Sequence, residues 1–202
     1  MPIKSLSQSS LLSFQKYSSF LAGNAAYSPS SYDLLETEIL TGSQASVTFS
    51  NLNSTYGSTY QHLQIRLVGR FAASYSNIEP AIQFNSDTGG NYTRHRLEGN
   101  GSSVTSSAQA SQTYLTLAGM PAASSTANVF GGAVIDILDP FETTKYTTVR
   151  SFGGMTSDNH ISLKSGLWMN TAAVDEIKLF EGFFATSWVQ YSRFSLYGLK
   201  AA

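Results

Sequence analysis

One short segment of this 202-residue chain brings together groups that could recognise a ligand. In the sequence NYTRHRLE, Tyr92, Arg94 and Arg96 occupy alternate positions, so on a β-strand their side chains would share one face. An aromatic ring beside guanidinium groups can stack on a sugar or bind a carboxylate or phosphate. We therefore predict a surface recognition patch at Tyr92, Arg94 and Arg96, with an ordinary solvated strand face as the alternative.

The remaining polar residues do not form a recognisable catalytic set. No serine lies in a G-x-S-x-G sequence, and the chain has only three histidines to act as general bases. Its three Gly-Gly pairs lack the lysine or the following helix of a phosphate-binding loop. The thirteen Asp and Glu residues could still supply the two facing carboxylates of a glycosidase. We expect no enzyme and no catalytic residues, and keep a glycan-binding or glycan-degrading protein as an alternative.

Metal ligands are also not grouped in the sequence. The histidines, His62, His95 and His160, lie far apart, and the chain has no cysteine for a disulfide or a thiolate metal site. Asp136 and Asp139 in VIDILDP have no regular loop of oxygen ligands around them, and Asp-Pro is typical of a turn. We expect no metal site and no cofactor.

The low content of charged residues argues against two classes of binding partner, nucleic acids and anionic membranes. Charged residues make up 12% of the chain, about half of the usual ~25%, and the net charge is -1. Nucleic acids and anionic membranes are bound by an excess of Lys and Arg, which this chain lacks. No run approaches the ~20 apolar residues of a membrane-spanning helix, and MPIKSLSQSSLLSF has no continuous apolar core of a signal peptide. We expect neither nucleic-acid binding, nor membrane insertion, nor a Sec-type signal.

Residues 1–31 differ in pattern from the rest. Leu11, Phe14 and Leu21 have the spacing of one helix face, and Gly23 could end that helix. A helix of this length needs a surface to pack against. We predict an N-terminal anchoring arm with Leu11, Phe14, Phe20 and Leu21 as its anchors, which either packs on the chain's own β domain or docks on a different protein.

From residue 32 onward, apolar residues alternate with polar ones in short segments separated by Gly, Asn and Ser clusters. The alternating apolar sets are Ala45, Val47 and Phe49; Leu63, Ile65 and Leu67; Ile82 and Phe84; Leu115 and Leu117; Ile161 and Leu163; Ile177 and Leu179; and Phe194 and Leu196. This pattern predicts an all-β domain over 32–202, an antiparallel β-sandwich of jelly-roll-like topology. We expect AVIDIL to be a central strand buried on both faces, residues 99–112 and 119–128 to be exposed loops, and the final SRFSLYGLK to be a strand that closes the sandwich.

Four segments in this order carry a family resemblance: ASVTFSNL (45–52), YQHLQIRLVGR (60–70), TKYTTVRSFGG (144–154) and SRFSLYGLK (192–200). Together they resemble a β-sandwich domain of virion and tail-fibre proteins of tailed bacteriophages, over roughly residues 32–200. The resemblance implies a structural protein of a phage particle. As a tail fibre or tail-associated appendage, it would be anchored by its N-terminal arm and display the sandwich for host attachment. The alternative is a capsid decoration or cement protein on the head.

The same resemblance implies partners and a location. We expect contacts with other virion proteins of the tail or capsid, assembly as a homotrimer, and a host surface glycan as a further partner. The expected location is the virion, after assembly in the host cytoplasm. A neutral, Ser- and Thr-rich exterior suits such a particle component.

Overall fold

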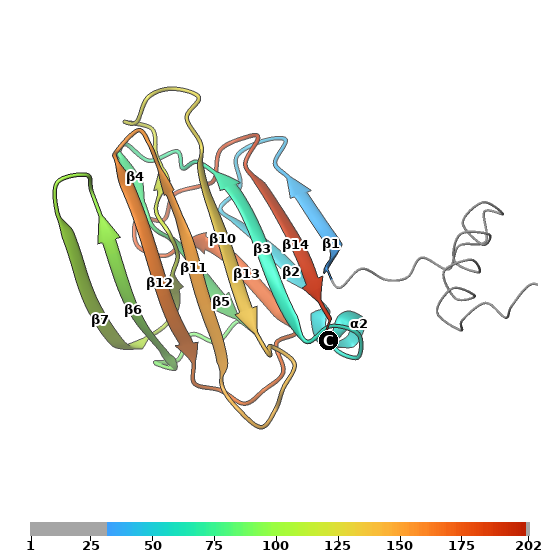
Figure 1. Ribbon diagram of the computed structural model, residues 1–202. Helices are drawn as coiled ribbons and strands as arrows, with labels where there is room; N and C mark the ends of the chain where they lie inside the picture. Colours follow the sequence, from blue (N-terminus) through green and yellow to red (C-terminus); the bar gives the residue numbers. More distant parts are fainter. Residues whose placement is uncertain (1–31, 201–202) are drawn as a thin grey trace, which may run out of the picture. The chain divides into compact units, whose positions relative to one another are not determined.

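Antiparallel strands form nearly all regular structure in residues 32–200, the part of the chain that the computed structural model describes (Figure 1). The large sheet contains, in spatial order, β1 (Tyr32–Ile39), β14 (Arg193–Leu199), β3 (His62–Gly69), β10 (Gly131–Leu138), β11 (Thr147–Met155), β12 (His160–Trp168), β6 (Tyr92–Gly99) and β7 (Val104–Gln112). The small sheet contains β2 (Ser46–Ser50), β13 (Glu176–Glu181), β5 (Pro80–Phe84) and β8 (Leu115–Thr116). A pair of two-residue strands, β4 (Asn77–Ile78) and β9 (Met120–Pro121), and the short helix α2 (Leu52–Tyr56) complete the described elements.

This architecture confirms the predicted all-β sandwich. Figure 1 shows the small sheet behind the large one, and the chain crosses between them repeatedly, as expected of a jelly-roll-like topology. The sheets are unequal, with eight strands against four, so part of the large sheet extends beyond the small one. We call the face of the large sheet that packs on the small sheet its inner face, and the opposite one its outer face.

The core lies between the sheets and follows the alternation seen in the sequence. On β3, Leu63, Ile65 and Leu67 are buried on the inner face, whereas Arg66 and Val68 point outward. At one end of the core, the rings of Phe71 and Trp188 stack with their centroids 4.0 Å apart. Other members of the core are Val47, Phe49, Ile82, Phe84, Leu115, Ile135, Ile137, Trp168, Ile177, Leu179, Phe194 and Leu196.

The last strand of the described chain lies inside the large sheet. β14 pairs with β1 on one side and with β3 on the other. The prediction of a C-terminal strand bound into a sheet is therefore confirmed, with two neighbours instead of an edge position. Its Phe194 and Leu196 are fully buried.

Two strands differ from their predicted burial. β10 is central, as expected, but its residues alternate, so that Ile135 and Ile137 are buried while Val134 is 39% exposed. Burial on both faces was wrong because no described element covers the outer face here. On β12 the alternation is reversed, since Ile161 and Leu163 point outward.

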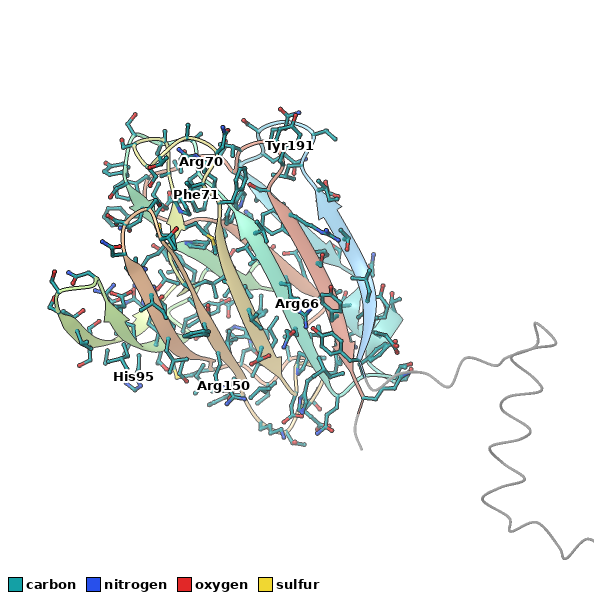
Figure 2. The ribbon with its side chains drawn as sticks, turned by 45° about the horizontal axis from the view of Figure 1, so that its top comes forward. Arg66, Arg70, Phe71, His95, Arg150 and Tyr191 are labelled. Carbon is teal, nitrogen blue, oxygen red and sulfur yellow. The ribbon has the colours of Figure 1, made fainter. Side chains whose placement is uncertain are left out.

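The two segments expected to be exposed loops differ from that prediction, since 99–112 is largely exposed but contains a strand and 119–122 is buried. The first contains β7, whose residues Val104–Ser111 are exposed and which pairs with β6 alone. The second contains β9 and is held by the buried Arg70 side chain (Figure 2). Its guanidinium donates hydrogen bonds to the backbone carbonyls of Thr126 and Val129, both at 2.9 Å, Ser125 at 3.0 Å and Ala123 at 3.4 Å.

The predicted anchoring arm, 1–31 with Leu11, Phe14, Phe20 and Leu21, lies outside the described residues, so its role stays a prediction. The first described strand, β1, begins at Tyr32, and the division into arm and β domain stays a prediction. Within residues 32–200, no helix has the length and apolarity needed to cross a membrane.

Candidate functional site

Tyr92 is part of the core and not of an exposed patch. Its side chain is 0% exposed and packs beside Phe84 and Trp168. The Tyr92 hydroxyl accepts a hydrogen bond from the Phe84 backbone N–H at 3.1 Å and donates one to the Asp87 carbonyl at 3.2 Å. Burial raises the pKa of this phenol. The prediction of a surface patch was wrong for Tyr92 because β6 begins directly against β5.

Arg94 and Arg96 follow Tyr92 on the same inner face of β6, as the alternation predicted, and both are half-buried. They lie where the large sheet extends beyond the small one. The Nε atom of Arg94 donates to Gln109 Oε1 on β7 at 2.7 Å. Arg96 instead donates through NH1 to Glu79 Oε1 at 3.0 Å. Their part in recognition stays a prediction.

Arg96 belongs to a cluster of four charged side chains, Glu79, Arg96, Glu98 and Lys164, that we call the charge cluster. Lys164 lies opposite Arg96 in the register of β12 and β6, so two cations occupy neighbouring positions. Glu79 Oε1 forms an ion pair with each of them, 2.8 Å from Lys164 Nζ and 3.0 Å from Arg96 NH1. Glu98 adds ion pairs at 3.4 Å to each cation. The Lys164 side chain is only 2% exposed, which explains why β12 turns its apolar residues outward.

The cluster sets the ionisation of its members. Burial disfavours the charged form of Glu79, but the charge and hydrogen bond of Lys164, with contributions from Glu98 and Arg96, lower the pKa of this carboxyl to about 2. Burial lowers the pKa of the Lys164 ammonium, and the charges of Glu79 and Glu98 act against this shift. Glu79 is therefore a carboxylate at neutral pH.

A cleft of about 360 Å³ opens beside the charge cluster, and we call it the aromatic cleft. Its lining comes from the segment around β4, from β6, from β8 and from the turn after β13: Tyr75, Asn77, Ile78, Glu79, Arg94, Tyr114, Thr116, Glu181, Gly182, Phe183 and Phe184. The cleft thus combines aromatic rings with a carboxylate, a guanidinium and hydroxyl groups. Such a mixture is typical of small-molecule sites.

The aromatic rings at the mouth of the cleft are exposed but held in place. Tyr75 and Phe184 stack with centroids 4.2 Å apart, and Phe183 meets Phe184 edge-on at 4.9 Å. The carboxylate of Glu181 accepts hydrogen bonds from the backbone N–H groups of Phe183, at 2.8 Å, and of Phe184. Gly182 fits under Tyr114, because a Cβ atom there would lie 2.6 Å from the ring.

A second notable surface is the outer face of the large sheet, which carries an apolar band. Its members, each between 39% and 55% exposed, are Val68, Val134, Phe152, Ile161, Leu163 and Leu97. The band runs straight across neighbouring strands, since Val134 lies opposite Phe152, Phe152 opposite Leu163, and Leu163 opposite Leu97. A groove of about 850 Å³ crosses it over β3, β10, β11 and β12. Its floor includes Gly132, at which a Cβ would meet only the Leu67 carbonyl oxygen, at 3.9 Å.

Positive charge borders the apolar band. Figure 2 shows Arg66 and Arg150 on β3 and β11, and Arg193 is exposed on β14. The Arg66 guanidinium lies 5.0 Å from the centre of the Tyr197 ring, a cation–π contact. The carboxylate of Asp136 lies opposite Arg150 on this face, so three arginines against this carboxylate leave the border of the apolar band basic.

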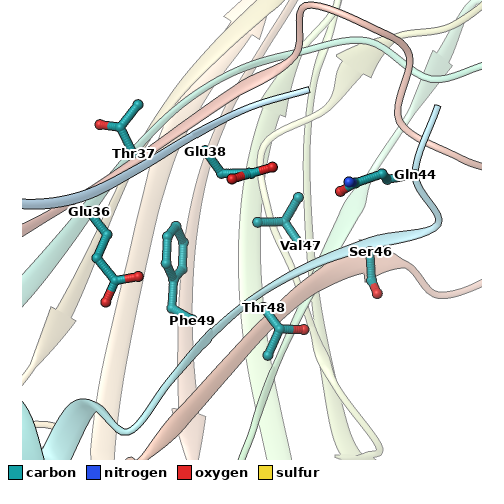
Figure 3. A pocket seen from close by; sticks show the side chains of 8 residues that line it. All are labelled: Glu36, Thr37, Glu38, Gln44, Ser46, Val47, Thr48 and Phe49. Carbon is teal, nitrogen blue, oxygen red and sulfur yellow. The ribbon is translucent and has the colours of Figure 1, made fainter. Parts of the chain in front are cut away.

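Negative charge gathers at a different edge of the sandwich. A cavity of about 220 Å³ lies between β1 and β2, where Glu36 and Glu38 face β2 (Figure 3). The other lining residues are Thr37, Gln44, Ser46, Val47, Thr48 and Phe49, so no basic side chain lines this cavity.

No group of three or more His, Cys, Asp or Glu side chains in residues 32–200 could hold a metal ion.

Sequence reasoning found Arg94 and Arg96 but missed Glu79, Lys164 and the aromatic rim, because these come from separate elements. The adjacent phenylalanines in EGFF, after a strand and before a turn, were the one local signal of that rim.

Comparison with known proteins adds no relative. No protein-family model matches the chain, and no curated protein matches it.

Proposed function

We propose that this chain is a structural protein of a tailed-phage particle, a tail fibre or tail-associated appendage that assembles with copies of itself and displays its sandwich for host attachment. The observation that carries the assembly part is the apolar band on the outer face. The phage assignment is supported by the sequence resemblance over residues 32–200, and the low charge of the chain is consistent with it.

The apolar band has the properties of a protein interface. Large apolar side chains lie on adjacent strands of the large sheet, with polar residues at their border. Contiguous apolar patches of this kind mark interaction sites, because a lone soluble chain gains nothing by exposing them to water. Complete burial of an exposed side chain of this size contributes about 1.5–3 kcal/mol. The members of the band are already about half-buried, so each has roughly half of that to gain, and together they favour association.

The occupant that we propose is a second copy of the chain, in a head-to-tail arrangement. The outer face carries Arg66, Arg150 and Arg193, so two outer faces placed against each other would juxtapose like charges. The cavity between β1 and β2 carries Glu36 and Glu38 without a basic neighbour in its lining. Contact between the basic-bordered band of one copy and the acidic edge of the next is complementary, and head-to-tail contacts close into rings such as trimers.

Sedimentation velocity on the full chain tests the proposal. We expect an oligomer for the unmodified protein and a monomer for the double variant Phe152→Asp with Leu163→Asp, because both substitutions place a carboxylate in the band. Phe183→Asp, at an exposed aromatic outside the band, is the matched control and should keep the oligomer. A monomeric unmodified chain at tens of micromolar, or a double variant that assembles normally, would overturn the proposal.

A further inference from the structure

We propose that the aromatic cleft is a binding site for a neutral saccharide, one or two sugar residues of a longer chain. The inference rests on the cleft alone and not on the assembly proposal. The cleft opens on the inner side of the large sheet and the apolar band lies on the outer side, so each can be altered separately.

The rim of the cleft provides a rigid aromatic platform. Phe183 is 80% exposed, yet its backbone is held by Glu181 and its neighbour Phe184 stacks on Tyr75. Fixed rings lose little conformational entropy when a ligand binds. The C–H face of a sugar ring is apolar and flat, so it fits against such a platform in the way that other flat apolar groups do.

Hydrogen-bonding groups lie beneath the platform. Glu79, Arg94, Tyr114 and Thr116 all line the cleft and together offer both donors and acceptors. The NH1 atom of Arg94 is buried without a hydrogen-bond partner among the described residues, which is costly unless a ligand or solvent supplies an acceptor. Ligand hydroxyl groups can both accept from Arg94 and donate to Glu79.

The charges of the lining select a neutral ligand. The lining itself carries Glu79 and Glu181 against the Arg94 guanidinium. Arg96, Lys164 and Glu98 adjoin Glu79, which makes three cations and three carboxylates in all, so the site offers no excess charge to an anionic sugar. A volume of about 360 Å³ is at the small end of the range for ligand pockets, ~300–1,000 Å³, and suits one or two sugar residues.

The same geometry favours binding over hydrolysis. Cleavage of a glycosidic bond needs one carboxyl group that is protonated and able to act as an acid. The pKa of Glu79 is lowered to about 2, against the effect of its burial, by the charge and hydrogen bond of Lys164, so this group stays ionised at neutral pH. Both oxygens of Glu181 accept backbone N–H groups, so they are already engaged within the protein. We therefore expect the saccharide to be bound and released without being hydrolysed.

Saturation-transfer NMR on the full chain tests the proposal, with a panel of neutral oligosaccharides of glucose, galactose, mannose and N-acetylglucosamine at millimolar concentration. Sialyllactose serves as the anionic comparison. We expect at least one neutral member to bind, to keep its structure during incubation, and to bind at least tenfold more weakly to Phe183→Ala and to Arg94→Gln. Phe152→Asp, in the apolar band, is the matched control and should bind normally.

Three results would overturn the inference: no neutral member binds, only sialyllactose binds, or Phe183→Ala and Arg94→Gln bind as the unmodified chain does. Circular dichroism of each variant separates loss of binding from loss of fold. A monomeric protein that still binds the saccharide would refute the assembly proposal alone, and an oligomer without binding would refute this inference alone.

Discussion

The ammonium group of Lys164 lies 2.8 Å from the carboxylate of Glu79, in the part of the sandwich where the large sheet extends beyond the small one. Lys164 projects from the inner face of β12, which in an ordinary sandwich would carry an apolar side chain. The ion pair makes this burial possible, and it places a carboxylate at the side of the aromatic cleft. Stability and ligand recognition therefore share one residue, Glu79.

Replacing Glu79 by Gln should remove part of the acid sensitivity of the fold. The folded pKa of this carboxyl, about 2, is below its ordinary value of 4.5, so its contribution is fully present above pH 4.5 and is lost as the pH falls toward 2. A pKa difference of this size corresponds to about 3 kcal/mol of stability. Urea unfolding at a series of pH values should show Glu79→Gln to be less stable at pH 7 and flatter between pH 4.5 and 2.

The control for this experiment is Glu142→Gln, at an exposed carboxylate in the β10–β11 loop. It should keep both the stability and the pH profile of the unmodified chain. If Glu79→Gln and the unmodified chain lose stability in parallel below pH 4.5, the ion pair with Lys164 does not have the assigned role.

Replacing Arg70 by Lys should loosen the segment that follows β9. The guanidinium donates through NH1 to the carbonyls of Thr126 and Val129 and through NH2 to those of Ala123 and Ser125, whereas an ammonium is a point donor and cannot span the two pairs. We expect a loss of about 2 kcal/mol in unfolding free energy. Limited proteolysis should cut Arg70→Lys faster within 122–130, while Arg150→Lys, at an exposed position, should behave as the unmodified chain. Equal cleavage of the two variants would show that Arg70 does not hold this segment.

Amide hydrogen exchange should separate β7 from the centre of the sheet. β7 has a hydrogen-bonded neighbour on one side only, and its residues from Val104 to Ser111 are exposed, whereas β10 is central and buries Ile135 and Ile137. Local opening costs least where few apolar contacts hold a strand. Mass spectrometry should therefore detect fast exchange in 104–111 and slow exchange in 131–138. Strong protection of β7 would mean that another chain covers it.

Removal of residues 1–31 should leave a folded protein. The described structure begins with β1 at Tyr32, and the core residues of the sandwich lie within 32–200. Circular dichroism and thermal unfolding of the chain 32–202 should give the strand signal and a cooperative transition. Under the anchoring prediction, the shortened chain should fail to enter particles. An unfolded product would show that the arm belongs to the core.

The sequence was most informative where strands carry a strict alternation between two sheets. β3 and β14 bury Leu63, Ile65, Phe194 and Leu196 as predicted, because both strands have the small sheet on one side and an uncovered face on the other. On such strands, the alternation of apolar and polar residues identifies the face that is buried in the core.

The sequence was misleading where the two sheets do not overlap. On β12 the alternation is intact, but the inner face meets charged residues, so Leu163 points outward and Lys164 inward. Periodicity gives the two faces of a strand but not which one is covered. The prediction that Tyr92 belongs to a surface patch was wrong for a related reason. Arg94 and Arg96 share the face of β6 that carries Tyr92, but they lie farther from the small sheet. The aromatic cleft needs residues from four separate segments, which no local pattern brings together.

The most direct measurement is the number of copies of this protein in purified particles of the phage that, under the proposed function, encodes it, by quantitative mass spectrometry against the major capsid protein. The account predicts a few to a few dozen copies, a number that fits a tail fibre or tail-associated appendage. Hundreds of copies would contradict the tail location and place the protein on the head as a decoration protein. Absence from the particles would contradict the central proposal itself.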